Sequence, residues 1–176
     1  MREAIRLLSS EGLVDLVPHR GAYVTMISKD EVREFFDLRL RLEPWLFREA
    51  SLRIPLADLD RAERMVKRMD KCSAVEWGPL NWELHEMLYQ AAERPAAMGI
   101  VRAIHEKSER YFRFQVVNAN IRQQAHDEHL ALIGLCRGRK ADEAEVALEH
   151  HISDAAKQIL AIVNRLLDEV LKERAA

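Results

Sequence analysis

The sequence predicts an all-α fold, an antiparallel bundle of six helices preceded by a short helix and a β-hairpin. Three observations lead to this prediction. Apolar residues recur every three or four positions from about residue 28 onward. Only six Gly and five Pro interrupt the 176 residues. The signals for helix ends leave short connections, which antiparallel bundles require.

The first 27 residues differ from the rest. Residues 1–11 place apolar side chains on one side of a helix, and Gly12 can end that helix in a left-handed conformation. Two short apolar runs follow at 13–17 and 22–27, separated by Pro-His-Arg-Gly at 18–21. Such runs around turn residues predict a hairpin with a basic turn.

The remaining chain carries helix signals throughout. Ser28 with Glu31 forms a capping-box pattern, and Pro44 predicts a kink. Arg94-Pro95 and Gly138-Arg139 mark clear breaks. The helices are predicted over about residues 28–53, 56–71, 75–92, 96–116, 121–137 and 142–173.

Composition limits the classes of function. With 27 basic and 29 acidic side chains, the overall charge does not attract nucleic acid or anionic membrane. Cys72 and Cys136 lie far apart, as in a reduced chain with buried thiols. The first twelve residues lack the apolar region of a signal peptide, and no apolar run is long enough to span a membrane. We expect a cytoplasmic protein with no membrane partner.

Four residues indicate a metal site: Asn81, His85, His129 and His151. Asn81 and His85 are one helical turn apart, so both can face one ion. His151 falls on the apolar stripe of the last helix, between Leu148 and Ala155. A single buried histidine is more often a core residue with an ordinary hydrogen-bond partner than a metal ligand. Here that explanation would have to apply to all three histidines independently. Zinc-type ions favour imidazole nitrogen, and amides can complete the shell.

Four motifs give the chain a family resemblance. They are DLRLRLEP at 37–44, NWELH at 81–85, DEHLALI at 127–133 and ALEHHI at 147–152. In this order they resemble the FCD ligand-binding domain of the GntR superfamily of bacterial transcription regulators. Residues 1–24 resemble the end of that family's winged helix-turn-helix. The resemblance implies an FCD-type bundle over 28–176 and a remnant of the DNA-binding domain over 1–27.

The resemblance also implies roles for individual residues. It makes His85, His129 and His151 ligands of a divalent metal, with zinc or nickel the best candidates, and Asn81 occupies a position that is usually Asp. An amide oxygen can ligate but brings no charge, so metal affinity should fall. Arg39 matches an arginine that faces the family's cavity and can bind a carboxylate effector. The alternative for Arg39 is a solvated salt bridge to Glu43.

The same resemblance implies operator DNA as a partner of the family. Arg2 matches a DNA-contacting arginine, and Arg20 lies at the tip of the wing. The first 24 residues carry three basic and three acidic side chains, which gives no net attraction for phosphates. The helices that complete such a DNA-binding domain are not in this sequence, so we expect no operator binding by this polypeptide alone.

Three functions remain open at this point. The leading one is the effector-binding and homodimerising part of a regulator that senses a small organic acid and is not an enzyme. The alternative is a metal-dependent hydrolase, in which Glu83, Glu86 or Glu128 acts as a base. The third is a helical interaction protein without a metal.

Overall fold

The computed structural model describes residues 3–5, 9, 14–17, 21–24, 28–115 and 119–175. Residues 3–5 and 9 are helical, while the rest of the predicted first helix, including Gly12, lies outside the described residues. The later elements are the strands β1 (Val14–Val17) and β2 (Gly21–Val24) and the helices α2 (Lys29–Ser51), α3 (Leu56–Met69), α4 (Ala74–Gln90), α5 (Pro95–Gln115), α6 (Ala119–Arg137) and α7 (Ala141–Ala175).

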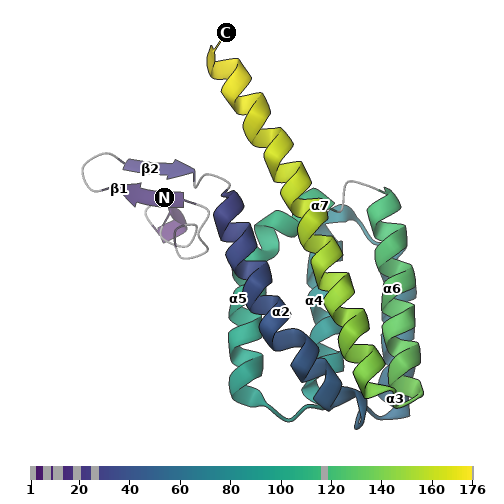
Figure 1. Cartoon of the computed structure of the whole chain (residues 1–176). Helices are drawn as coiled ribbons and strands as arrows, with labels where there is room; N and C mark the ends of the chain where they lie inside the picture. Colours follow the sequence, from purple (N-terminus) through teal and green to yellow (C-terminus); the bar gives the residue numbers. More distant parts are fainter. Residues whose placement is uncertain are drawn as a thin grey trace.

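The two strands form the predicted hairpin, with an antiparallel register that pairs Val14 with Val24 and Val17 with Gly21. Gly21 has φ of 101°. Residues with a side chain rarely adopt this conformation, whereas glycine does so at little cost. In Figure 1 the hairpin lies to one side of the bundle, beside the first turn of α2.

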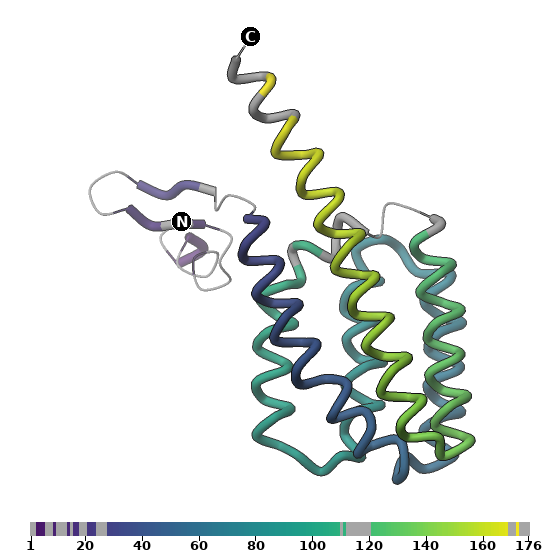
Figure 2. The backbone as a smooth tube through the Cα atoms, in the orientation of Figure 1, coloured from purple at the N-terminus to yellow at the C-terminus, as the bar shows by residue number. Residues whose placement is uncertain are grey.

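The six helices form the predicted antiparallel bundle (Figures 1 and 2). α2 packs along α7 over most of its length, and α3, α4, α5 and α6 complete the bundle. The last helix continues past the end of the bundle on the side where the hairpin lies. No helix in the described part of the chain has the length and apolar character needed to cross a membrane.

Local sequence explains where the helices begin and end. Ser28 accepts a hydrogen bond from the Glu31 amide at 3.2 Å and caps α2. The complete capping box is at α4 instead, where Ser73 and Glu76 bond reciprocally. After α6 the left-handed residue is Arg139, with φ of 54°, rather than its neighbour Gly138.

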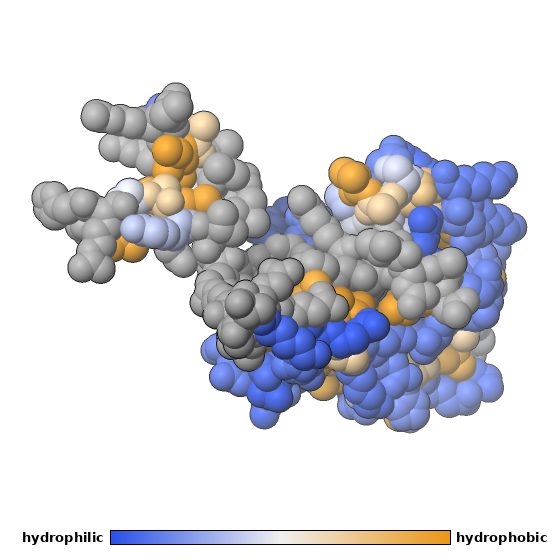
Figure 3. All heavy atoms as spheres, turned by 90° about the horizontal axis from the view of Figure 1, so that it is seen from above, coloured by the Kyte–Doolittle hydropathy of each residue, from blue (hydrophilic) through white to orange (hydrophobic). Residues whose placement is uncertain are grey.

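The core is apolar with a polar centre. Leu46, Phe47, Leu84, Leu148 and Ile159 are among the side chains with no exposed surface. Figure 3 shows the contrast with the outside, where hydrophilic residues make up most of the coloured surface of the bundle on this face. The polar groups buried inside are therefore an unusual feature that needs an explanation.

Candidate metal centre

The three predicted histidines come together from three helices. His85 lies on α4, His129 on α6 and His151 on α7, and their ring centroids are 4.9 to 5.3 Å apart. One nitrogen from each ring lies within 4.8 Å of the others. The rings are at most 9% exposed. Side chains up to 66 positions apart in the sequence thus form one cluster in the core.

Asn81 faces the same region. It lies one turn before His85 on α4 and lines a small cavity together with Arg39 and His151. The cavity holds about 30 Å³, which is room for little more than a water molecule or an ion.

The buried polar atoms fit a metal ion. Among the residues that the structure describes, the Asn81 Oδ1, His85 Nε2 and His129 Nε2 atoms are buried and have no hydrogen-bond partner. Native proteins rarely leave such atoms unsatisfied, because each costs about 1–3 kcal/mol. Imidazole nitrogens and an amide oxygen are donors that a zinc-type ion accepts.

His151 is held by a carboxylate at the mouth of this cavity. Its Nδ1 lies 2.6 Å from Glu128 Oε2. The other oxygen of Glu128 accepts a hydrogen bond from Gln124 at 2.7 Å, and Gln124 in turn accepts one from Gln158 on α7 at 3.0 Å. Burial raises the pKa of Glu128, but the bonds from His151 and Gln124 outweigh it and lower the pKa overall. The ionised carboxylate then accepts the Nδ1 proton, so Nε2 is the nitrogen of His151 that could hold an ion.

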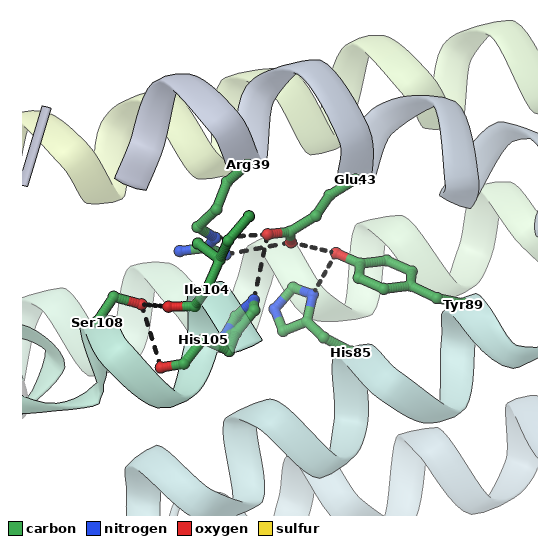
Figure 4. Close-up of polar contacts among 7 residues, drawn as sticks. All are labelled: Arg39, Glu43, His85, Tyr89, Ile104, His105 and Ser108. Atoms are coloured by element: carbon green, nitrogen blue, oxygen red, sulfur yellow. Dashed lines mark hydrogen bonds and ion pairs between the residues drawn. The ribbon is translucent and has the colours of Figure 1, made fainter. Parts of the chain in front are cut away.

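His85 is held by a longer chain of bonds that leads to α2 (Figure 4). Its Nδ1 lies 2.9 Å from the hydroxyl of Tyr89, and that hydroxyl donates to Glu43 Oε2 at 2.8 Å. Glu43 also accepts bonds from Arg39 Nε at 2.6 Å and Nη2 at 3.3 Å, and its Oε1 lies 3.2 Å from His105 Nε2.

The charges of this inner network follow from the pKa directions. Burial alone would raise the pKa of Glu43, but Arg39 beside it holds that pKa well below the usual value, so Glu43 is ionised. Burial lowers the pKa of His105, and so does Arg39. Burial also raises the pKa of Tyr89 well above 10.0, so this phenol keeps its proton.

The cluster itself disfavours protonation. Burial lowers the pKa of His85 and of His129 well below 6.5, and the neighbouring histidines lower both further. Neutral imidazole is the form that binds a metal.

Two histidines that neighbour the proposed ligands in sequence, and the other candidates from the sequence, lie elsewhere. His150 is exposed, and His126 bonds to Asp70 at 2.8 Å. Arg2 and Arg20 lie outside the described residues. Of the proposed bases for a hydrolase, Glu83 is exposed, Glu86 pairs with Arg102, and Glu128 is committed to His151.

The alternative for Arg39 was right about the partner and wrong about the setting. Arg39 does pair with Glu43, but the two side chains are 2% and 0% exposed, so this salt bridge is not solvated. Sequence reasoning missed the roles of Tyr89 and His105. Tyr89 follows His85 by one turn, and His105 lies beside Ile104 on the buried face of α5. These helical positions were the only hints in the sequence that Tyr89 and His105 lie near His85.

Comparison with known proteins agrees with this architecture. The family model of the FCD domain matches residues 34–154. An HTH-type regulator of Paraburkholderia xenovorans, BphR, is 26% identical over 88% of this chain and 67% of its own length. The Nta operon transcriptional regulator of Aminobacter aminovorans is 24% identical over 97% of this chain and 81% of its own length.

Solved structures share the fold. E. coli McbR/YncC has a TM-score of 0.72 at 16% identity, covering 94% of this chain and 84% of that one. A GntR family member from Pseudomonas syringae pv. tomato has a TM-score of 0.69 at 22% identity, covering 93% of this chain and 70% of that one. Because the family model matches more than half of the sequence, the chain belongs to the FCD family, alongside transcriptional regulators of the GntR type.

Proposed function

We propose that this chain is the effector-sensing and dimerising part of a GntR-type transcription regulator. A divalent ion, zinc or nickel, would be held by His85, His129, His151 and Asn81. The single observation that carries the proposal is the set of buried donor atoms on Asn81, His85 and His129 that have no partner among the described residues.

The charge of such a site favours an anionic effector. Three neutral imidazoles and an amide leave the two positive charges of the ion uncompensated in the ligand shell, because Asn81 replaces the usual Asp. A small carboxylate would supply the missing negative charge and could also contact Arg39, which lines the same cavity.

The size of the cavity supports a conformational response. A volume of about 30 Å³ is too small for an organic acid of several heavy atoms, so binding requires α6 or α7 to move. An effector shifts the helix packing only if it binds the opened state more tightly than the closed one.

The proposal assigns residues 28–176 to sensing and dimerisation and residues 1–27 to the end of a DNA-binding domain. The relatives named above are transcriptional regulators, and operator binding would require the rest of that domain. A homodimer would match a two-fold operator. Four apolar side chains of α2 are candidates for its interface: Phe35, Phe36, Leu40 and Trp45. Trp45 is 40% exposed, as is its neighbour Leu38 at 39%, whereas Phe35 and Leu40 are partly buried and Phe36 is in the core.

The test is a thermal-shift screen of small organic acids, on metal-loaded and on chelated protein. A cognate acid should raise the midpoint of the loaded wild type through mass action. It should have much less effect on the chelated protein and on Arg39→Lys, which keeps the charge but loses the two-pronged geometry. Arg39→Ala also breaks a buried ion pair, so the ligand-induced shift is compared rather than the midpoint itself.

Two results would refute the proposal. The first is a wild-type protein that holds no metal by elemental analysis after reconstitution. The second is a tight ligand that is uncharged, or one whose stabilisation survives Arg39→Ala. For the dimer, a monomeric mass by light scattering at micromolar concentration would count against it.

A further inference from the structure

Glu43 is the centre of a buried network that joins three helices. It lies on α2 with no exposed surface and accepts bonds from Arg39, Tyr89 and His105. Ser108, one turn after His105 on α5, bonds back to the carbonyls of Ile104 and His105 (Figure 4). Thus α2 and α5 both contribute to the environment of a tyrosine on α4.

Stability alone does not explain why these groups are buried. Removing two charges from water costs several kcal/mol per ion, and an apolar core of the same volume is often at least as stable as a buried ion pair. The direction of the bonds suggests another role, because the network ends on a candidate ligand, His85.

The hydrogen bonds determine which nitrogen of His85 carries the proton. Glu43 is an ionised acceptor, so the single proton of the Tyr89 hydroxyl is donated to it. The oxygen of Tyr89 is then left to accept, and the partner at 2.9 Å is His85 Nδ1, which must be the protonated nitrogen. The lone pair therefore lies on Nε2, the atom that is buried without a partner among the described residues.

We propose that Glu43 is the positioning residue of the metal site, acting through the Tyr89 hydroxyl to fix the tautomer and ring orientation of His85. This inference rests on the proposed metal centre. Glu43 and Tyr89 do not touch the ion in this scheme. They keep the Nε2 lone pair of His85 directed into the cluster, as outer-shell groups do for many metal-binding histidines. Arg39 and His105 in turn hold Glu43 in place.

The variant that isolates this role is Tyr89→Phe. It removes one hydroxyl and keeps the ring that packs edge-on against Phe47, with centroids 6.1 Å apart. The matched control is Tyr111→Phe. Tyr111 is equally buried, but its hydroxyl bonds to Glu31 and the Ser28 amide at the start of α2, away from the histidines.

The first measurement needs no metal. Long-range ¹H–¹⁵N NMR of the histidine rings, assigned by the loss of signals in His85→Gln, distinguishes the two tautomers. We expect the Nδ1–H form of His85 in the wild type and in Tyr111→Phe, and a mixture or the Nε2–H form in Tyr89→Phe. An Nε2–H tautomer in the metal-free wild type would overturn the inference without any variant.

The second measurement is zinc affinity by competition with a chelating dye. Loss of an outer-shell partner typically weakens metal binding about 10- to 100-fold, so we expect that loss in Tyr89→Phe and an affinity near wild type in Tyr111→Phe. Equal losses in both variants, or none in either, would contradict a positioning role. If the wild type binds no zinc, the proposed function fails; if it binds zinc and Tyr89→Phe is unchanged, only this inference fails.

Discussion

The histidine cluster has two unlike sides. On the inner side His85 is held through Tyr89 by a carboxylate that is fully buried and paired with Arg39. On the outer side His151 is held directly by Glu128, which is 30% exposed. Both arrangements direct an Nε2 atom into the cluster. The difference teaches that one side is fixed by the core, whereas the other can respond to whatever enters the cavity.

The largest expected effect concerns the group that both sides share. His129 is close to both other rings, 5.2 Å from His85 and 4.9 Å from His151 by centroid. We expect His129→Ala to abolish metal binding, because two imidazoles and an amide leave the shell incomplete. Elemental analysis after reconstitution measures this, with His126→Ala as the control on the same helix. Retention of one equivalent of metal in His129→Ala would disprove the ligand set.

The two carboxylates should differ strongly in their effect on folding. Glu43→Ala removes the carboxylate that pairs with the buried Arg39, and breaking a buried ion pair typically costs about 3–5 kcal/mol of unfolding free energy. Glu128→Ala removes an acceptor that is 30% exposed and should cost at most about 1 kcal/mol. Urea unfolding of both metal-free variants measures the difference. Equal losses would mean that the inner and outer sides do not differ as described.

The pH dependence tests the buried rings. The pKa values of His85 and His129 in the folded protein are depressed by burial, so the unfolded chain binds protons first, near pH 6.5. This part of the stability is complete above about pH 6.5 and is lost as pH falls. The midpoint of the metal-free protein should drop between about pH 8 and about pH 5.5, and less steeply in His129→Gln than in His126→Gln. If the unfolding midpoint falls equally steeply with pH in both variants, the buried His129 does not contribute to the pH dependence.

A substitution at Asn81 should increase metal affinity, by less than the loss expected for His129→Ala. Asn81→Asp adds a full negative charge beside the proposed ion, so metal affinity should rise by about tenfold, or about 1.4 kcal/mol. At the same time the added charge should weaken the binding of any carboxylate effector, because the two anions repel. Competition with a chelating dye measures the metal affinity. An unchanged or weaker affinity would place Asn81 outside the ligand shell.

The smallest effect concerns the outer side alone. The bond between Gln158 and Gln124 joins α7 to α6 beside the cavity. Its loss in Gln124→Ala should cost about 0.5–1.5 kcal/mol, so a chelator should remove the metal about 2- to 12-fold faster. Gln123→Ala, on the exposed face of the same helix, is the control. A removal rate equal to that of the control would show that this bond does not restrict access.

Much of the fold could be predicted because its signals are local. Helical periodicity, Ser28, Arg94-Pro95 and Gly138-Arg139 predicted six helices, and each helix lies within about two residues of its predicted range. The hairpin followed from two apolar runs around turn residues. The spacing also predicted that three histidines and Asn81 face one region of the core, and the family resemblance pointed to the same four residues as candidate ligands.

The inner side of the site could not be predicted in the same way. Tyr89, Glu43 and His105 lie on three different helices, and only tertiary packing brings them together. Arg39 and Glu43 at i and i+4 have the spacing of an ordinary surface salt bridge, and sequence spacing does not reveal whether such a pair is solvated. Burial makes the Arg39–Glu43 pair important for stability, because an unpaired charge in the core is far more costly than one in water.

The position of Glu43 within α2 determines how far a movement at the histidine cluster could displace the start of this helix. Glu43 lies 14 residues after Lys29, the first residue of this helix, which is roughly 21 Å along the axis at 1.5 Å per residue. A tilt of about 5° around Glu43 would move the start of the helix, next to the hairpin, by roughly 2 Å, and shifts of about 1–2 Å are typical of allosteric helix movements. A change too small to disturb the packing around the histidines would thus be amplified at the end of the helix that leads to the hairpin.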